Sequence, residues 1–322
     1  MKVKKWLVSL LMGSVILLGA CSSNEGTADT DEVIKIGTLN FIEHESLSAA
    51  EAGFYQALED NGYIEGENLE IEFVSAQGAQ DNLNPMAEQI VNSNDMILSL
   101  GTATTQALAN VEQEKPILFT AVTDPVSAGL IESQEAPGGN ITGTSDYMPI
   151  DQQIKLLLSL DPEAQSVGVI YNSSEPNSEI QAKEAIQYIE DAGLEAVVTT
   201  VTSTNDVQQN LMSIARDIDL LYIPTDNTIA GTMPTVKEIT IDNQIPSVLG
   251  APEMVEAGGL ATYSIDYASL GYQAGEMAVE ILKGQAEPAT TPYENADELI
   301  LVVNEEVAEA LGIDPDSIQI PE

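Results

Sequence analysis

The sequence predicts an α/β protein with two lobes, each built around a parallel β-sheet, and a hinge made of several strands that join them. Short apolar runs rich in β-branched residues alternate with helical stretches, a pattern typical of β-α-β units. This alternation occurs in two series, separated by a glycine-rich segment at 136–144. The chain has 322 residues, 43% of them hydrophobic, so each series can bury a core of its own.

The two series have similar lengths and a similar order of elements. In the first, we predict strands at 33–40, 69–75, 96–100 and 116–122, with helices at 46–61, 81–92 and 102–113. In the second, we predict strands at 166–171, 195–201, 220–223 and 246–249, with helices at 151–159, 178–192, 206–214 and 229–243. A helix separates each strand from the next in both series, which favours parallel pairing within each lobe.

Further segments predict that the chain crosses between the lobes more than once. Glycines at 138–139 and 258–259 each precede a short extended stretch, and residues 267–284 return to helical spacing. A strand at 299–303 and a helix at 305–311 follow a third crossing near 290–292. We therefore predict one lobe from residues 33–144 plus 265–290 and the other from 145–264 plus 291–322.

The amino terminus has the features of an export signal. Lys2, Lys4 and Lys5 precede an apolar run at 7–18 that is too short for a membrane span. The tetrapeptide 18–21 (LGAC) resembles the lipobox of bacterial lipoproteins, which implies a signal peptide at 1–20 and a diacylglyceryl group on Cys21. Residues 21–32 are small and polar and are expected to form a flexible tether. The alternative is an ordinary secretory peptide with a chance cysteine.

Composition excludes several classes of function. The chain has 52 acidic and 10 basic residues, and the basic residues beyond the signal are scattered singly, so no nucleic-acid partner is expected. The acidic excess is typical of a solvated surface in a saline or alkaline habitat. With one cysteine, Cys21, and one histidine, His44, we expect no thiol chemistry, no metal, no cofactor and no enzyme activity. A pair of carboxylates in a cleft stays open as a catalytic possibility.

Several segments together resemble a known family. They are 36–38 (IGT), 99–102 (SLGT), 119–126 (FTAVTDPV), 139–143 (GNITG), 168–172 (GVIYN) and 267–284 (YASLGYQAGEMAVEILKG). In these segments the chain is similar to the substrate-binding lipoproteins of ABC transporters of the tryptophan/tyrosine type, and the similarity spans nearly the whole chain. The resemblance implies the type-I periplasmic-binding architecture of two Rossmann-like lobes.

The resemblance also implies a role and a location. The protein is expected to bind an amino acid of the aromatic class (tryptophan, tyrosine or phenylalanine) between its lobes and to deliver it to an ABC permease and its ATPase. It is expected to be a monomer, held by its lipid anchor on the outer face of the cytoplasmic membrane, as in Gram-positive bacteria. Two alternatives remain open: the same role for a nucleoside, sugar or polyamine, or a sensor that presents its ligand to a receptor.

In sheets of this kind ligands bind beyond the carboxyl ends of the strands, so the loops there supply the candidate site. The helix that starts at Thr102 offers free N–H groups and hydroxyls for a carboxylate, while Asp124, Asp226 and Glu175 are candidates for an ammonium group. No basic residue lies in these loops, which argues against ligands with several negative charges. The full set of candidate ligand-binding residues is Phe41, Glu43, Thr102, Thr104, Thr123, Asp124, Asn172, Glu175, Asn177, Thr225, Asp226, Asn227 and Asp266.

Each candidate also has a purely structural interpretation. Thr102 and Asp226 could only cap the helices that follow them, since Thr and Asp at strand-to-helix junctions commonly do so. Glu43 could simply be solvated, and Phe41 could pack in the core. Asn172 and Asp266 lie where hinge hydrogen bonding is as plausible as ligand contact.

Overall fold

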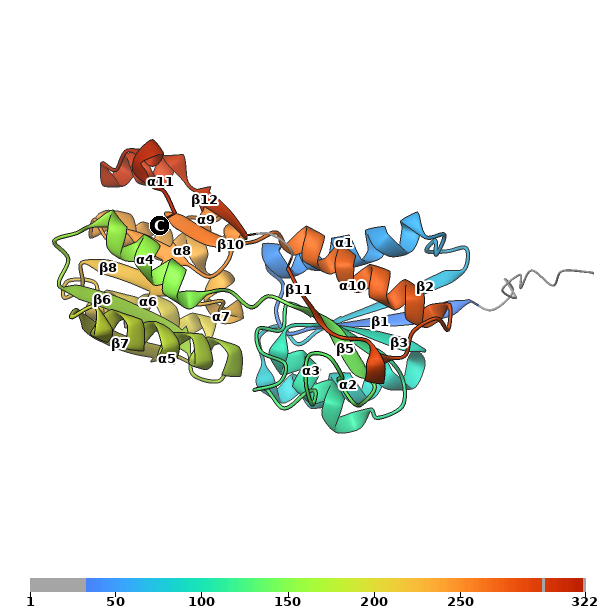
Figure 1. Ribbon diagram of the computed structural model, residues 1–322. Coiled ribbons are helices and arrows are strands. Elements are labelled where there is room, and N and C mark those ends of the chain that lie inside the picture. Colours follow the sequence, from blue (N-terminus) through green and yellow to red (C-terminus); the bar gives the residue numbers. More distant parts are fainter. Residues whose placement is uncertain (1–32, 297–298, 321–322) are drawn as a thin grey trace, which may run out of the picture.

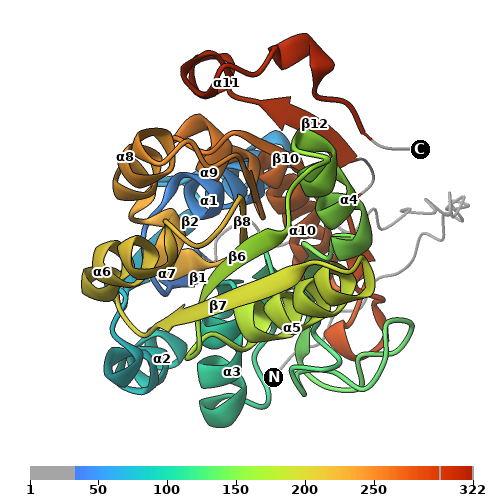
Figure 2. The same ribbon diagram turned by 90° about the vertical axis from the view of Figure 1, so that its left-hand side faces the viewer.

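The structure is a computed structural model that describes residues 33–296 and 299–320. The predicted signal peptide, Cys21 and the tether at 21–32 lie outside the described residues. The described chain forms an α/β protein with two six-stranded sheets (Figures 1 and 2). Within it, no helix is long and apolar enough to cross a membrane.

The first sheet has the strand order β11-β5-β4-β3-β1-β2, and its paired strands are parallel throughout. Its strands are β1 (Ile34–Asn40), β2 (Leu69–Ser75), β3 (Met96–Leu100), β4 (Ile117–Thr120), β5 (Ile141–Ser145) and β11 (Glu294–Asn295). Between the strands run α1 (Glu45–Asp60), α2 (Gln80–Ser93) and α3 (Thr102–Val111). We call this sheet and its helices the first lobe.

The second sheet repeats this arrangement, with the order β12-β10-β9-β8-β6-β7. Its strands are β6 (Ser166–Asn172), β7 (Glu195–Val201), β8 (Leu220–Ile223), β9 (Ser247–Leu249), β10 (Ala261–Ile265) and β12 (Leu299–Val303), the last antiparallel to β10. Its helices are α4 (Ile150–Leu160), α5 (Pro176–Asp191), α6 (Thr204–Ile214), α7 (Asn227–Ala230), α8 (Met233–Asp242), α9 (Pro252–Glu256) and α11 (Glu305–Leu311). We call it the second lobe.

Helices cover both faces of each sheet. In the first lobe, α1 and α10 (Tyr267–Leu282) lie on one face and α2 and α3 on the other (Figure 1). In the second lobe, α4 packs with α5 on one face and α6 packs with α8 on the other (Figure 2). The central strands β3, β4, β8 and β9 are therefore buried throughout, which explains their nearly continuous apolar sequences.

The chain passes between the sheets three times in the described residues: after β5, after β10 and between β11 and β12. The 3-10 helix Pro288–Thr290 comes before β11, and a second one, Pro315–Ser317, lies near the carboxyl terminus. β11 pairs with β5, so the chain is still in the first sheet at Asn295. The lobe boundary at 290/291 drawn from the sequence stays a prediction.

Two segments differ in detail from the sequence prediction. The single helix expected at 229–243 is wrong: the structure has α7 and α8, separated at Gly231 and Thr232. Pro234 lies in the first turn of α8, where its missing N–H costs nothing, whereas inside a longer helix it would remove a hydrogen bond. The extended crossovers expected near 141–144 and 260–264 are β5 and β10, full members of their sheets.

Glycines let α1 and α10 pack with their backbones nearly touching. A Cβ atom on Gly271 would lie 1.8 Å from the carbonyl oxygen of Ala50, and one on Gly53 would lie 2.0 Å from that of Ala268. Both distances are far inside van der Waals contact, so these two positions accept no side chain without moving a helix. This packing fixes α10, which begins at a crossover, to the first lobe.

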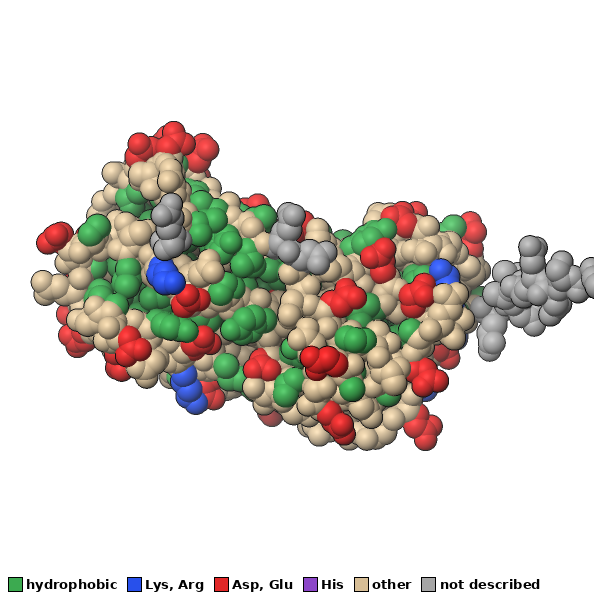
Figure 3. Space-filling model, in the orientation of Figure 1, with side chains coloured by type: hydrophobic (Ala, Val, Ile, Leu, Met, Phe, Trp, Pro, Cys, Tyr) green, Lys and Arg blue, Asp and Glu red, His purple; other side chains and the backbone are tan. Residues whose placement is uncertain are grey.

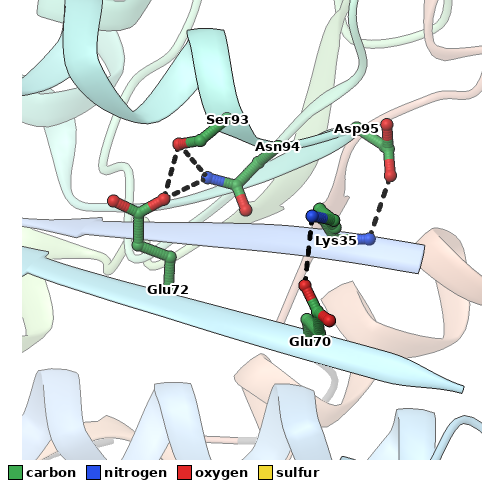
Figure 4. Close-up of polar contacts among 6 residues, drawn as sticks. All are labelled: Lys35, Glu70, Glu72, Ser93, Asn94 and Asp95. Atoms are coloured by element: carbon green, nitrogen blue, oxygen red, sulfur yellow. Dashed lines mark hydrogen bonds and ion pairs between the residues drawn. The ribbon is translucent and has the colours of Figure 1, made fainter. Parts of the chain in front are cut away.

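Polar contacts tie the carboxyl end of α2 to the first two strands (Figure 4). Glu72 on β2 accepts hydrogen bonds from the Ser93 hydroxyl at 2.5 Å and from Asn94 Nδ2 at 2.9 Å. These bonds lower the pKa of Glu72. Lys35 on β1 pairs with Glu70, and its backbone N–H donates to Asp95 Oδ2 at 3.0 Å.

Acidic side chains are spread over both lobes on the face shown in Figure 3, and few basic ones accompany them. The sequence has a formal net charge of −42. Ion pairs between described residues join Lys35 to Glu70, Lys155 to Asp151, Lys183 to Glu179 and Lys237 to Glu306, and they all involve exposed side chains. Such pairs contribute little stability, so most of the negative charge is left to solvent and counter-ions.

Candidate functional site

A small cavity lies between the two lobes, beyond the carboxyl ends of strands from both sheets. Both lobes contribute to its lining. Some lining residues follow β1, β4 and β5 of the first sheet or lie at the crossover after β10. The others follow β8 and β9 of the second sheet, and one lies in α5. The lining residues are His44, Ser46, Leu47, Ala121, Asp146, Asn177, Thr225, Asp226, Asn227, Ala230, Ala251, Met254 and Tyr267.

The lobes touch each other around this cavity. His44 Nε2 lies 3.0 Å from Asn227 Oδ1, Gln80 Nε2 donates to the Ser174 carbonyl at 3.4 Å, and Gln181 Nε2 donates to Thr123 Oγ1 at 3.5 Å. One apolar cluster includes lining residues from both lobes. The structure therefore shows the lobes closed over the cavity.

Asp146, which directly follows β5, supplies a buried carboxylate to the cavity. Its Oδ2 accepts a hydrogen bond from the Tyr267 hydroxyl at 2.9 Å, while its Oδ1 is buried without a partner among the described residues. Burial raises the pKa of Asp146, because a charged carboxylate away from water is unfavourable. An unpaired buried acceptor is costly, so this oxygen is suited to a donor from a ligand.

Glu175, by contrast, is fully paired. Its two oxygens accept from the backbone and side chain of Asn227 at 3.1 and 2.6 Å, from the backbone and hydroxyl of Thr228 at 3.0 and 2.7 Å, and from Asn172 Nδ2 at 3.2 Å. These donors hold the start of α7 in place. Glu175 is not among the residues that line the cavity.

Asp226 lines the cavity and also caps α7. Its Oδ1 accepts from the Ile229 N–H at 2.9 Å and its Oδ2 from the Asn172 N–H at 2.5 Å. Burial and the neighbouring charge of Glu175 raise the pKa of Asp226. Asp226 therefore caps α7, as one of the two interpretations of the sequence expected, and both of its carboxylate oxygens already have donors.

Two further polar atoms in the lining have no partner in the described part of the chain. Asn177 donates to the Thr225 carbonyl at 2.9 Å, which leaves its Oδ1 unpaired. His44 makes the bond to Asn227 through Nε2, which leaves its Nδ1 unpaired. Burial lowers the pKa of His44, opposed by its contact with Asn227, so the ring is neutral at physiological pH.

Strained backbone also marks the first-lobe wall. Ala121 lines the cavity with φ of 57°, a left-handed conformation that non-glycine residues seldom adopt and that is often retained at ligand sites. Next to it, Gly101 donates to the Thr120 carbonyl, and α3 starts without a side-chain cap. The Thr102 hydroxyl there is buried and unpartnered among described residues. The amino-terminal end of α3 thus has a hydroxyl donor, on Thr102, that no described residue accepts.

Four of the residues proposed from the sequence line the cavity: Asn177, Thr225, Asp226 and Asn227. Thr123 lies beside it, in contact with Gln181, and Thr102 lies at the start of α3. The others have structural surroundings: Thr104 bonds to the Leu100 and Gly101 carbonyls, and Asn172 bonds within the Glu175 network.

The remaining candidates are not among the residues that line the cavity. Phe41 is buried in the first-lobe core, Glu43 is exposed, and Asp124 bonds to the Ser127 N–H at 2.9 Å. Asp266 is exposed and caps α10 through the N–H groups of Ala268 and Ser269.

Sequence reasoning missed several lining residues, above all Asp146 and His44. Asp146 follows a segment interpreted as a crossover; reading that segment as a strand would have placed Asp146 at a carboxyl end. His44 was considered only as a metal ligand or a catalytic residue. Within the described residues no group of three or more His, Cys, Asp or Glu is arranged to hold a metal ion.

Comparisons with known proteins agree with this architecture. The family described as "ABC transporter substrate binding protein" matches residues 35–319. A curated "Tyrosine-binding protein" from Clostridioides difficile (strain R20291) is 39% identical over 321 residues, which cover 96% of this chain and 93% of that protein.

Two solved structures are similar at comparable identity. One, from Streptococcus pneumoniae in complex with L-Trp, is 37% identical with a TM-score of 0.83, covering 90% of this chain and 97% of that one. The other is the ligand-free, open structure of a substrate binding protein with adhesive properties from Clostridium difficile; it is 40% identical with a TM-score of 0.66, covering 88% and 96%. The chain shares the type-I periplasmic-binding fold and belongs to the family of ABC transporter substrate-binding proteins.

Proposed function

We propose that this substrate-binding protein captures an aromatic amino acid in the cavity between its lobes and delivers it to an ABC importer. The observation that carries the proposal is the buried, unpaired Oδ1 of Asp146 in a cavity that also has an apolar wall. Such a cavity suits a ligand with an ammonium group at one end and an apolar body.

The polar groups favour a cationic head. The Asp146 and Asn177 oxygens are acceptors without donors, and the cavity lining in the described residues includes no Lys or Arg. An ammonium group offers three N–H donors and a charge that matches the carboxylate. Together with the missing basic residues, this excludes ligands with several negative charges, such as phosphates.

A single carboxylate can be accommodated at the start of α3. The N–H groups of the first helical turn have no acceptor within the helix, and the Thr102 hydroxyl is a further donor. Gly101, just before the helix, lies near Ala121, which lines the cavity. These free donors support the anion site that we propose at the start of α3, and such a site favours a zwitterionic amino acid over a polyamine.

The apolar wall suits the side chain of the ligand. Leu47 and Ala121 face Ala230, Ala251 and Met254 across the cleft. Two relatives indicate the aromatic class: the similar protein from C. difficile is named for tyrosine, and the similar structure from S. pneumoniae holds L-Trp.

The export features add a location. Residues 1–20 and Cys21 support a lipoprotein anchored on the outer face of the cytoplasmic membrane, from which a captured ligand reaches the permease. Cys21→Ala should release the protein from the cell surface into the medium; retention at the membrane would contradict the lipid anchor.

Calorimetry on the mature protein tests the choice of ligand. Tryptophan, tyrosine and phenylalanine should be compared with nucleosides, sugars and a polyamine such as spermidine. Saturable binding to the aromatic amino acids and none to the others is the expected result. Binding of a nucleoside, sugar or polyamine instead would favour the alternative ligand class within the same family.

A further inference from the structure

His44 connects the two lobes at one end of the cavity. It precedes α1 in the first lobe, and its Nε2 lies 3.0 Å from Oδ1 of Asn227, which begins α7 in the second lobe. Its Nδ1 is buried and has no partner among the described residues. Whether Nδ1 can accept a hydrogen bond depends on which ring nitrogen carries the proton.

The hydrogen bonds around Asn227 determine which nitrogen of His44 is protonated. The Glu175 carboxylate receives five hydrogen bonds, among them the Asn227 backbone N–H at 3.1 Å and the Asn227 Nδ2 at 2.6 Å. A carboxylate only accepts, so the amide of Asn227 must turn its NH₂ toward Glu175 and its oxygen toward His44. An amide oxygen also only accepts, so His44 Nε2 must donate. In a neutral imidazole the other nitrogen, Nδ1, is then an acceptor.

Burial favours this neutral form, because it lowers the pKa of His44. The closed cavity therefore presents a fixed lone pair on Nδ1, and a buried acceptor without a donor is unfavourable. A ligand that brings an N–H or O–H group to this point removes the penalty, and one that brings a carbon does not.

His44 lies away from the place proposed for the ammonium group. It follows β1 and Asp146 follows β5, and β3 and β4 lie between these strands. Adjacent strands are about 4.8 Å apart, so the two strand ends are separated by roughly 14 Å. A second, outer hollow shares His44, Ser46, Ala230 and Met254 with the cavity but does not include Asp146. Both residues line the cavity, and the strands that they follow lie three strand spacings apart.

We propose that His44 is a specificity-determining residue: its Nδ1 accepts a hydrogen bond from a donor on the ligand side chain, and this bond selects tyrosine and tryptophan over phenylalanine. The inference rests on the proposed function, since it assumes that the ammonium group lies at Asp146. It adds that the aromatic ring must carry a phenol O–H or an indole N–H at the His44 end.

Matched ligand pairs test the proposal on the unaltered protein. Phenylalanine differs from tyrosine by the hydroxyl, and 3-benzothienylalanine differs from tryptophan by sulfur in place of the indole N–H. Calorimetry should give affinities on the order of tenfold weaker for the member of each pair without the donor. Equal affinities within both pairs would overturn the proposal while leaving aromatic amino-acid binding intact.

Two substitutions assign the effect to Nδ1. In His44→Gln the side-chain amide NH₂ can still reach Asn227, but no acceptor remains at the place of Nδ1. In His44→Asn an oxygen can take that place, and the contact with Asn227 is lost. We expect His44→Gln to bring the tyrosine-to-phenylalanine affinity ratio close to one, and His44→Asn to keep it while weakening both ligands.

The outcomes separate the inference from the proposed function. If His44→Gln weakens tyrosine and phenylalanine equally, His44 receives the ammonium group and the proposed ring contact is wrong. If His44→Gln keeps the full preference for tyrosine, another residue selects the ring donor. If the unaltered protein binds none of the aromatic amino acids but binds another ligand, the proposed function itself fails.

Discussion

Asp146 and Glu175 are both fully buried carboxylates near the same cleft, yet their surroundings give them different roles. Five donors surround Glu175, so it organises the start of α7 and has no capacity left for a ligand. Asp146 accepts a hydrogen bond from Tyr267, burial raises its pKa, and the Thr123 hydroxyl is close enough to lower that pKa in part. Its buried Oδ1 makes no hydrogen bond that meets ordinary geometry with a described residue. Because Asp146 lines the cavity and keeps an unpaired oxygen, it is the carboxylate that we propose for ligand binding.

Asp146→Asn should weaken amino-acid binding on the order of 10- to 100-fold, since a charged hydrogen bond is lost. The asparagine oxygen would take the Tyr267 hydroxyl, which turns the NH₂ group toward the ligand ammonium. Calorimetry with tyrosine measures the change. Asp124→Asn is the matched control, because Asp124 lies outside the cavity lining and its bond to the Ser127 N–H survives as an asparagine cap. Equal effects of the two substitutions would contradict the assignment.

Binding should release protons. Burial raises the pKa of Asp146 in the ligand-free protein, and a neighbouring ammonium group lowers it again. Affinity is therefore greatest above the raised pKa and falls as the pH decreases through it, because the carboxyl group must lose its proton to receive the ligand. Titrations in two buffers of different ionisation enthalpy measure the proton count. Net proton uptake on binding would contradict the proposed ammonium contact.

Some of the individual residues that line the cavity could be predicted from the sequence. Asn177, Thr225, Asp226 and Asn227 follow strands whose limits were recognisable from their apolar residues, and all four line the cavity. Which carboxylate keeps a free oxygen depends on donors that come from distant segments, such as Tyr267 for Asp146. Local sequence does not contain that information.

The helix α10 both contributes a residue to the cavity and packs against the first lobe. It begins directly after β10 of the second lobe with Tyr267, a lining residue, and then packs against α1 in the first lobe. The close approach at Gly271 and Gly53 holds the helix against α1 and so fixes the place of Tyr267 relative to Asp146.

Gly271→Ala should lower the free energy of unfolding by about 1–3 kcal/mol, because the new methyl group meets the Ala50 carbonyl oxygen and pushes the helices apart. Thermal unfolding followed by circular dichroism measures the loss. Gly139→Ala is the control, since a Cβ atom there has no neighbour within 4 Å. The account of this packing would be wrong if both substitutions left the unfolding temperature unchanged.

Most elements could be predicted from the sequence, since apolar runs and helical spacing are local properties. The predicted strand at 69–75 coincides with β2, and the helix predicted at 267–284 is α10, two residues shorter. The division at Gly231 was missed although Pro234 signals a helix start. β11 has two residues, and only its pairing with β5 makes it a strand, so no local pattern predicts it.

For the whole molecule, the negative charge should set how stability depends on salt. The formal net charge is −42, and the ion pairs between described residues are exposed. Added NaCl should raise the unfolding temperature. The rise should be steepest up to about 0.1 M, because over that range the screening length falls to about 10 Å. KCl should act equally if screening is the cause. A flat or falling curve would show that repulsion between surface charges does not limit stability.

Closure of the two lobes brings the site together, because Asp146 and His44 come from the first lobe side and Asn177, Asp226 and Asn227 from the second. The chain has one tryptophan, Trp6, which lies in the predicted signal peptide, so the mature protein should emit as a tyrosine protein. The emission of bound L-tryptophan can therefore be followed without background.

Aromatic amino-acid binding can be measured by titrating the mature protein into a fixed, low concentration of L-tryptophan, excited at the red edge of its absorption. We expect a saturable blue shift as the indole leaves water for the cavity, reversed by excess tyrosine and largely absent with Asp146→Asn. An unchanged spectrum at saturating protein, together with no heat in calorimetry, would contradict the claim that this cavity binds aromatic amino acids.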